Sequence, residues 1–367
     1  MKTTAKIVYN YTEKTGDIIM KNRSYNLDLM RVILGISVIA VHSFHYFGIE
    51  DPLIDSLFRI LLITCDGLFY MISGYFNLEK EFKNKDDIIR FYKNKFVTVF
   101  FPFLAFVFVW TIWDYVHVMG SVNVPDIFLT YYKEIVDISA DGHMWFMYPM
   151  FGLLLSTPFL SKMLHSMDES ELKILWRIAI GINILAYYFC YDLGIGFSML
   201  CWVLEGWTIY YFAGYYYRHV IVKEKKIKWI ILAIVGYAFT VLGINGMLPF
   251  FEAFEDATSV QPMYTFLCIG CFMFWDQVVK IRNNTVAKVV MFLSKNNYMV
   301  YLFHTRGIEY VVRKLNITEA NAGSGFIVVI GAYLVSLLLA FVANLCLKPI
   351  QSLLRKLLKI NNNNRQQ

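Results

Sequence analysis

The first apolar stretch of the chain reads Asp28-Leu-Met-Arg31-Val-Ile-Leu-Gly-Ile-Ser-Val-Ile-Ala-Val-His42-Ser-Phe-His45. It is apolar enough to enter a bilayer, but its arginine, histidines and aspartate are costly there, and such residues mark functional sites in membrane proteins. On a helix, Arg31 and His42 lie on one face, about 16 Å apart along the axis. Asp28 and His45 follow the same stripe. The stretch therefore predicts a membrane helix with a polar, functional face.

The composition of the chain is that of a membrane protein. Hydrophobic residues make up 57% and charged residues 17%, whereas soluble domains carry about 25% charged residues. Apolar runs of about 20 residues recur along nearly the whole sequence, as spanning helices require. We therefore predict an all-α, polytopic integral membrane bundle. The net charge of +6 falls mostly in loops and tails, so we expect the lipid bilayer and no nucleic acid as a partner.

Ten apolar segments are predicted to cross the membrane. They cover approximately residues 27–47, 57–78, 96–118, 144–163, 173–191, 199–217, 229–251, 263–279, 289–311 and 326–347. Lysine and arginine gather at both ends of the chain and in alternate loops, and the remaining loops carry mostly acidic residues. Because basic loops stay inside the cell, this asymmetry predicts that both the N- and the C-terminus are cytoplasmic.

The same pattern divides the chain into three parts. Residues 1–26 form a polar, basic cytoplasmic leader, and residues 351–367 form a polar, basic cytoplasmic tail. Residues 27–350 form one transmembrane domain, with no soluble domain of any size attached. Cys268 and Cys271 form a C-x-x-C without a second pair or an adjacent histidine, so we interpret them as small buried hydrophobic residues and expect no metal site.

Five predicted helices bring acidic or imidazole groups to the middle and outer depth of the membrane. These groups are His42, Asp66, His143, Glu205 and His304. For each residue alone, the competing interpretation is a satisfied polar group inside the bundle or an interfacial anchor. The recurrence of such groups at one depth favours a shared site.

A basic cluster of Arg90, Lys93 and Lys95 directly precedes the third segment. The tendency of cytoplasmic flanks to be positive explains such a cluster without any function. The functional interpretation is a phosphate clamp, because arginine and lysine at a membrane entrance hold phosphate groups of a carrier molecule. Arg31 faces the same compartment and would join this clamp.

Five short motifs, taken in order, resemble the signatures of one family. They are R-x10-H from Arg31 to His42, D-G-L-F-Y-M-I-S-G-Y from Asp66, the basic entry at 90–102, H-M-W-F-M-Y from His143, and Y-L-F-H ending at His304. Together they resemble the acyltransferase 3 family, integral membrane proteins of bacteria that O-acylate cell-surface glycans. The resemblance extends from about residue 24 to residue 350.

The resemblance implies transfer of an acyl group, commonly acetyl from acetyl-CoA, to a sugar hydroxyl at the bacterial plasma membrane. His42 would then be the general base or carry the acyl group transiently, because an imidazole titrates near working pH. Arg31, Arg90, Lys93 and Lys95 would hold the donor. The remaining groups, Asp66, His143, Glu205 and His304, would orient His42, bind the acceptor or stabilise charge. The expected partners are acyl-CoA as donor substrate, a carbohydrate acceptor and other glycan-assembly proteins, with no tightly bound cofactor.

Two other function classes fit a polytopic bundle with charges at mid-membrane depth. A transporter of a small solute or glycan component would show an internal repeat or matching broken helices, and the two halves of this sequence do not correspond by eye. A non-catalytic partner in glycan export or assembly is the third class. Solute uptake and acyl transfer to a surface glycan distinguish these possibilities.

Overall fold

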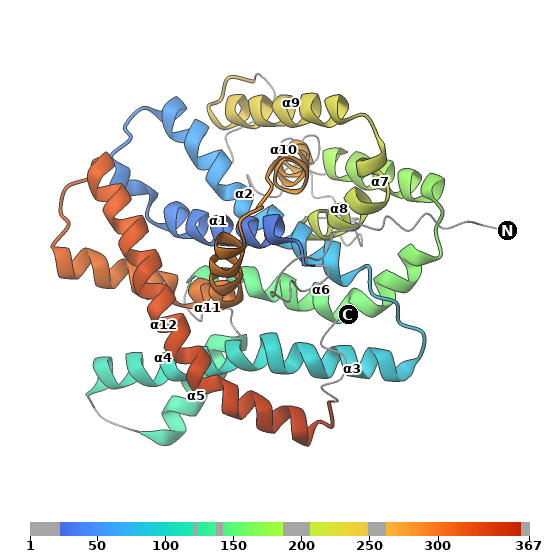
Figure 1. Ribbon diagram of the computed structural model, residues 1–367. Helices are drawn as coiled ribbons and strands as arrows, with labels where there is room; N and C mark the ends of the chain where they lie inside the picture. Colours follow the sequence, from blue (N-terminus) through green and yellow to red (C-terminus); the bar gives the residue numbers. More distant parts are fainter. Residues whose placement is uncertain (1–22, 121–122, 137–141, 186–205, 249–261, 361–367) are drawn as a thin grey trace.

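The computed structural model describes residues 23–120, 123–136, 142–185, 206–248 and 262–360 (Figure 1). All regular structure in these ranges is helical, which confirms the all-α prediction. The α-helices are α1 (Tyr25–His42), α2 (Pro52–Asn77), α3 (Lys85–Lys95), α4 (Phe101–Met119), α5 (Val124–Val136), α6 (Met147–His165), α7 (Glu169–Ile184), α8 (Trp207–His219), α9 (Lys226–Ile244), α10 (Pro262–Met273), α11 (Asn284–Leu315) and α12 (Ala322–Leu357). Short 3₁₀ or π turns add η1 (Phe44–Phe47), η2 (Phe96–Phe100), η3 (Gly142–Phe146), η6 (Ile221–Lys223) and η8 (Phe274–Val278).

Each of the ten predicted segments overlaps a helix of the described chain. Five helical stretches are long and apolar enough to cross a membrane: Tyr25–His42, Pro52–Asn77, Lys85–His117, Lys226–Ile244 and Ala322–Leu357. The third of these stretches is continuous through α3, η2 and most of α4. The structure therefore supports an integral membrane protein, and the number of ten crossings stays a prediction.

Two differences from the sequence prediction concern helix boundaries. Helix α5 was not predicted, because Asp126, Lys133 and Glu134 interrupt its apolar pattern. Helix α12 continues to Leu357, beyond the predicted boundary at residue 350. The extension is anchored to α3, since Arg355 donates a hydrogen bond to the Asn94 side chain at 3.2 Å.

The start of α1, the end of α2 and η8 lie at the same end of the bundle. The Asn26 side chain donates hydrogen bonds to the backbone oxygens of Trp275 and Asp276, both in η8. The Arg31 guanidinium lies over the Phe76 ring at the end of α2, at 5.0 Å. We call this side of the bundle the Arg31 end. The opposite side, where the backbone N–H of Asn321 donates to the Tyr46 oxygen, is the His42 end.

Helix α1 runs through the middle of the bundle, packed against α2, α11 and α12 (Figure 1). Helix α8 packs against α2 through two glycines that allow the backbones to approach closely. A Cβ at Gly74 would collide with the Tyr211 carbonyl oxygen, and one at Gly214 with the Met71 carbonyl oxygen. Helices α2, α11 and α12 bury residues on several faces of α1, while His42 at its end is exposed.

Candidate functional site

Three predicted site histidines meet at the His42 end of the bundle. His42 is the last residue of α1, His143 lies in η3, and His304 lies in α11. The ring centroids of His42 and His304 are 4.9 Å apart, those of His143 and His304 are 4.6 Å apart, and those of His42 and His143 are 6.5 Å apart. We call these residues the histidine cluster. Segments separated by more than 100 positions in the sequence thus converge on one point.

The three rings differ in their access to a ligand. His143 is 3% exposed and His304 is fully buried, whereas His42 is exposed. A group that exchanges a proton with a substrate must come within hydrogen-bonding reach of it. His42 is therefore the member of the histidine cluster that is placed to react, and the other two lie behind it.

Tyr301 on α11 forms a hydrogen bond with each of the two buried histidine residues. His304 Nδ1 lies 2.5 Å from the Tyr301 backbone oxygen, and because a carbonyl only accepts, Nδ1 is the donor. Nε2 of His304 then carries a lone pair, and it is buried without a hydrogen-bond partner among the described residues. The Tyr301 hydroxyl donates to the His143 backbone oxygen at 2.6 Å, which ties η3 to α11. Tyr301 belongs to the Y-L-F-H motif, but sequence reasoning gave it no role.

Asp66 and Glu205, the two acids predicted for the site, are not seen to join the histidine cluster. Asp66 lies in α2 and its Oδ1 is 3.6 Å from the Cys65 sulfur. Within the described ranges it makes no hydrogen bond or ion pair to a histidine, although its charge acts on the nearby hydroxyls of Tyr70 and Tyr301. Glu205 lies outside the described residues.

Arg31 is held at the other end of α1 by a buried aspartate. Asp28 is 1% exposed, and it accepts hydrogen bonds from Arg31 at 2.8 Å and from the Ser294 hydroxyl at 2.9 Å. It also forms an ion pair with Arg23. Charge-assisted bonds of this kind restrict the position of a guanidinium, so Asp28 fixes where Arg31 points.

Two lysines extend this positive charge. The ammonium groups of Lys80 and Lys95 each lie 5.4 Å from the centroid of the Phe91 ring, and the positive charges of Lys80 and Arg31 act directly on Lys95. In the described part of the chain, neither lysine has a carboxylate within 4.0 Å. We call Arg31, Lys80 and Lys95 the cation cluster. Because like charges repel, a cluster of this kind is suited to binding an anion such as phosphate.

Arg90 and Lys93, also predicted to bind the donor, contact other partners. Arg90 is exposed and lies 3.7 Å from Asp87. Lys93 donates a hydrogen bond to the Leu358 backbone oxygen at 2.9 Å, so it caps the end of α12. On α3, Lys93 and Lys95 are two positions and about 200° apart, so they point in nearly opposite directions. Sequence reasoning missed Lys80, which follows α2 in a loop.

The described residues contain no group of three or more histidine, cysteine or acidic side chains arranged to hold a metal ion. Cys65 and Cys268 are buried and Cys271 is half-buried, and all three are free thiols. The histidine cluster contributes imidazoles alone.

A comparison with protein-family models gives one result for this chain. The model described as an acyltransferase domain, that of the acyltransferase 3 family, matches residues 24–345. This match includes the histidine cluster, Asp66 and the cation cluster. No curated protein and no solved structure matches the chain.

Proposed function

The chain belongs to the acyltransferase 3 family, and from this premise we propose that it is a membrane O-acyltransferase. The donor is acetyl-CoA on the cytoplasmic side of a bacterial plasma membrane. The acceptor is a hydroxyl group of a cell-surface or secreted polysaccharide, or of its precursor. The observation that carries this proposal is the arrangement on α1, where an exposed histidine and an anchored arginine occupy one helix face.

His42 is the general base in this proposal. Its imidazole accepts the proton of the acceptor hydroxyl while the hydroxyl oxygen attacks the thioester carbonyl carbon. A carbon–oxygen bond forms, the carbon–sulfur bond breaks, and the leaving thiolate takes the proton back from the imidazolium. An acyl-histidine intermediate is the alternative route through the same residue. The buried His143 and His304 pack behind the ring and restrict its movement.

The cation cluster holds the donor. Its charges suit the phosphates of coenzyme A, because charge-assisted contacts to phosphate are strong and lysine ammonium groups offer three donors each. The polar face of α1 leads from Arg31 to His42 over about 16 Å. The pantetheine arm spans this distance beside α1, so that the thioester reaches the histidine cluster while the nucleotide stays at the Arg31 end.

The test measures transfer of radiolabelled acetyl from acetyl-CoA to surface carbohydrate in membranes that contain the full chain. We expect His42→Ala to lower the rate by about 100-fold or more, as the loss of a general base does. His45→Ala is the matched control, because His45 is also exposed and lies outside the histidine cluster. Wild-type activity in His42→Ala would contradict the role of His42. Solute uptake without any acetyl transfer in the parent protein would favour the transporter.

A further inference from the structure

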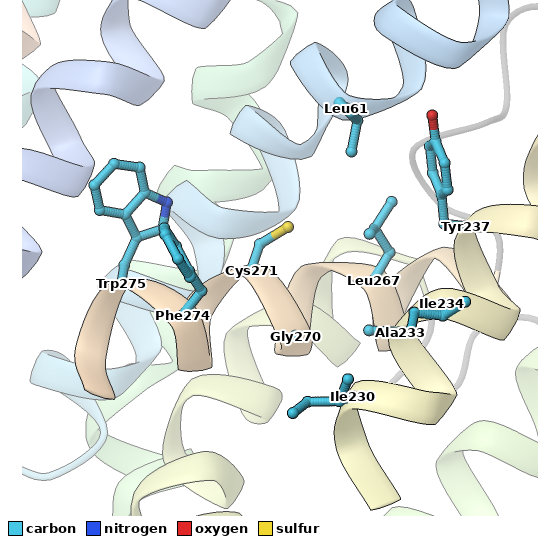
Figure 2. A pocket seen from close by; sticks show the side chains of 10 residues that line it. All are labelled: Leu61, Ile230, Ala233, Ile234, Tyr237, Leu267, Gly270, Cys271, Phe274 and Trp275. Carbon is cyan, nitrogen blue, oxygen red and sulfur yellow. The ribbon is translucent and has the colours of Figure 1, made fainter. Parts of the chain in front are cut away.

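An apolar groove lies where α2, α9 and α10 meet, and its lining includes no residue of the histidine cluster or the cation cluster. Its volume is about 290 Å³. Figure 2 shows Ile230 and Ile234 from α9, Leu267 and Cys271 from α10, and Trp275 from η8 along its length. The lining is almost entirely hydrocarbon and aromatic, and the groove opens to the surface of the protein.

Small residues and hydrogen bonds shape this groove in advance. Gly270 and Ala233 face each other at its base, where a Cβ on Gly270 would collide with that of Ala233. The Tyr237 hydroxyl donates to the Leu57 backbone oxygen at 2.7 Å and fixes one wall. At the other end, Asn26 holds the Trp275 backbone oxygen at 2.9 Å. A preformed hollow of this kind is typical of a binding site.

The surface of α9 beside the groove is suited to hydrocarbon rather than to water. Helix α9 is one of the stretches that are long and apolar enough to span a membrane, and little of it is buried inside the protein. Its residues Ile227, Ile231 and Val235 are exposed beside the groove. In a bilayer such a face contacts lipid tails. The hydrocarbon chains of lipids are therefore the ligand nearest to the groove.

Positive charge marks one end of the groove. Lys226 begins α9 one turn before Ile230, so the two residues share a helix face. Lys280 closely follows η8, which carries Trp275. Both lysines are exposed, and neither has a carboxylate partner within 4.0 Å in the described ranges. The nearby acids are already engaged, since Asp276 accepts from Tyr217 and Glu224 from Lys228 and Trp229.

We propose that this groove binds one acyl chain of an anionic glycerophospholipid, with the lipid phosphate against Lys226 and Lys280. The apolar lining selects the hydrocarbon chain. The two lysines select negative charge, as basic residues at a membrane surface do for anionic lipids. This lipid site is independent of the proposed acetyl transfer, because it shares no residue with the histidine cluster or the cation cluster.

Trp275 provides a direct readout, because bromine atoms on a lipid chain quench tryptophan fluorescence on contact. The full chain is reconstituted in phosphatidylcholine vesicles that contain increasing fractions of brominated phosphatidylglycerol or brominated phosphatidylcholine. The chain has eight tryptophans, so the Trp275 signal is taken as the difference between the parent and Trp275→Phe. We expect this signal to be half-quenched at a several-fold lower fraction of the anionic lipid.

Two kinds of variant separate the acyl-chain contact from the charge contact. Cys271→Met and Cys271→Phe each extend a side chain into the groove and should remove the excess quenching, while Ile231→Phe changes a neighbouring exposed residue of α9 and should not. Lys226→Gln combined with Lys280→Gln should equalise the two lipids. Lys85→Gln, an exposed lysine at the start of α3, is the matched control for charge and should keep the preference. Size-exclusion profiles and circular dichroism identify any variant that does not fold.

Three outcomes would overturn the proposal. Equal quenching by both lipids in the parent protein would remove the preference for anionic lipid. Unchanged quenching in folded Cys271→Met and Cys271→Phe would place the lipid contact elsewhere. Protection of Trp275 from quenching by bromine that increases with the protein-to-lipid ratio would show that a second copy of the chain, and not a lipid, covers the groove.

Discussion

The cation cluster gives the sharpest quantitative prediction about the donor site. Lys80→Met and Lys95→Met each remove one charge but keep an unbranched apolar stem that still packs on the Phe91 ring. Contacts to charged groups are worth about 1.5–3 kcal/mol when well buried. Both lysines are half-buried, so screening by solvent reduces the expected loss to about 1–2 kcal/mol for each. Each single variant should then weaken acetyl-CoA binding by about 5- to 30-fold.

The double variant tests whether the two lysines bind the same group. Residues that share a partner have non-additive effects, so the combined loss should be smaller than the product of the single losses. Calorimetric titration of the detergent-solubilised protein with acetyl-CoA measures Kd, and initial rates measure KM and kcat. Lys83→Met is the matched control, because the Lys83 side chain is 78% exposed. An unchanged Kd in both single variants, or a loss confined to kcat, would refute the assignment of the donor site.

Three further predictions follow from other contacts. Asp28→Asn keeps the shape of a buried side chain but removes the charge that anchors Arg31, so KM for acetyl-CoA should rise by about 5- to 10-fold. An unchanged KM would show that the ion pair between Asp28 and Arg31 does not contribute to donor binding. Tyr301→Phe loses the hydroxyl bond to the His143 backbone, and kcat should fall by about 10-fold with KM unchanged. Burial favours the neutral form of the Glu79 carboxyl, but the hydrogen bond from His219 and the charge of Arg218 outweigh it and lower the pKa of Glu79. The stability that the Glu79 carboxylate contributes is therefore fully present above its unfolded pKa of about 4.3. It is lost as the pH falls through the lower pKa of the folded state. The midpoint of thermal unfolding, measured from pH 6 to pH 3, should show this loss in the parent protein and a weaker loss in Glu79→Gln.

Helical periodicity accounts for the part of the site that sequence alone could predict. The placement of Arg31 and His42 on one face of α1 depends only on their spacing and on the stretch being helical. The same rule separates Lys93 from Lys95 on α3, where the two are about 200° apart. Treating Arg90, Lys93 and Lys95 as one clamp ignored this local geometry. In the structure, Lys93 donates to the Leu358 backbone oxygen and Lys95 lies over the Phe91 ring.

Contacts between distant segments account for the part that sequence could not predict. Lys80 joins the cation cluster because the loop after α2 turns it towards Phe91, and no local pattern in the sequence encodes that turn. The distances within the histidine cluster likewise depend on how η3 and α11 pack beside the end of α1. The order of the motifs indicates which residues belong together, but it carries no information on which of them contact each other.

The burial of the individual site residues is the property that the sequence of a membrane protein predicts least well. In a soluble protein, an apolar neighbourhood indicates the core, but in a bilayer the surface that faces lipid is as apolar as the interior. His42, His143 and His304 all lie among apolar residues in the sequence. Only the packed helices show that His42 is exposed while His143 and His304 are buried. The proposed assignment of His42 as the base, with His143 and His304 packed behind it, therefore rests on tertiary structure, because a base that no substrate reaches cannot take a proton from it.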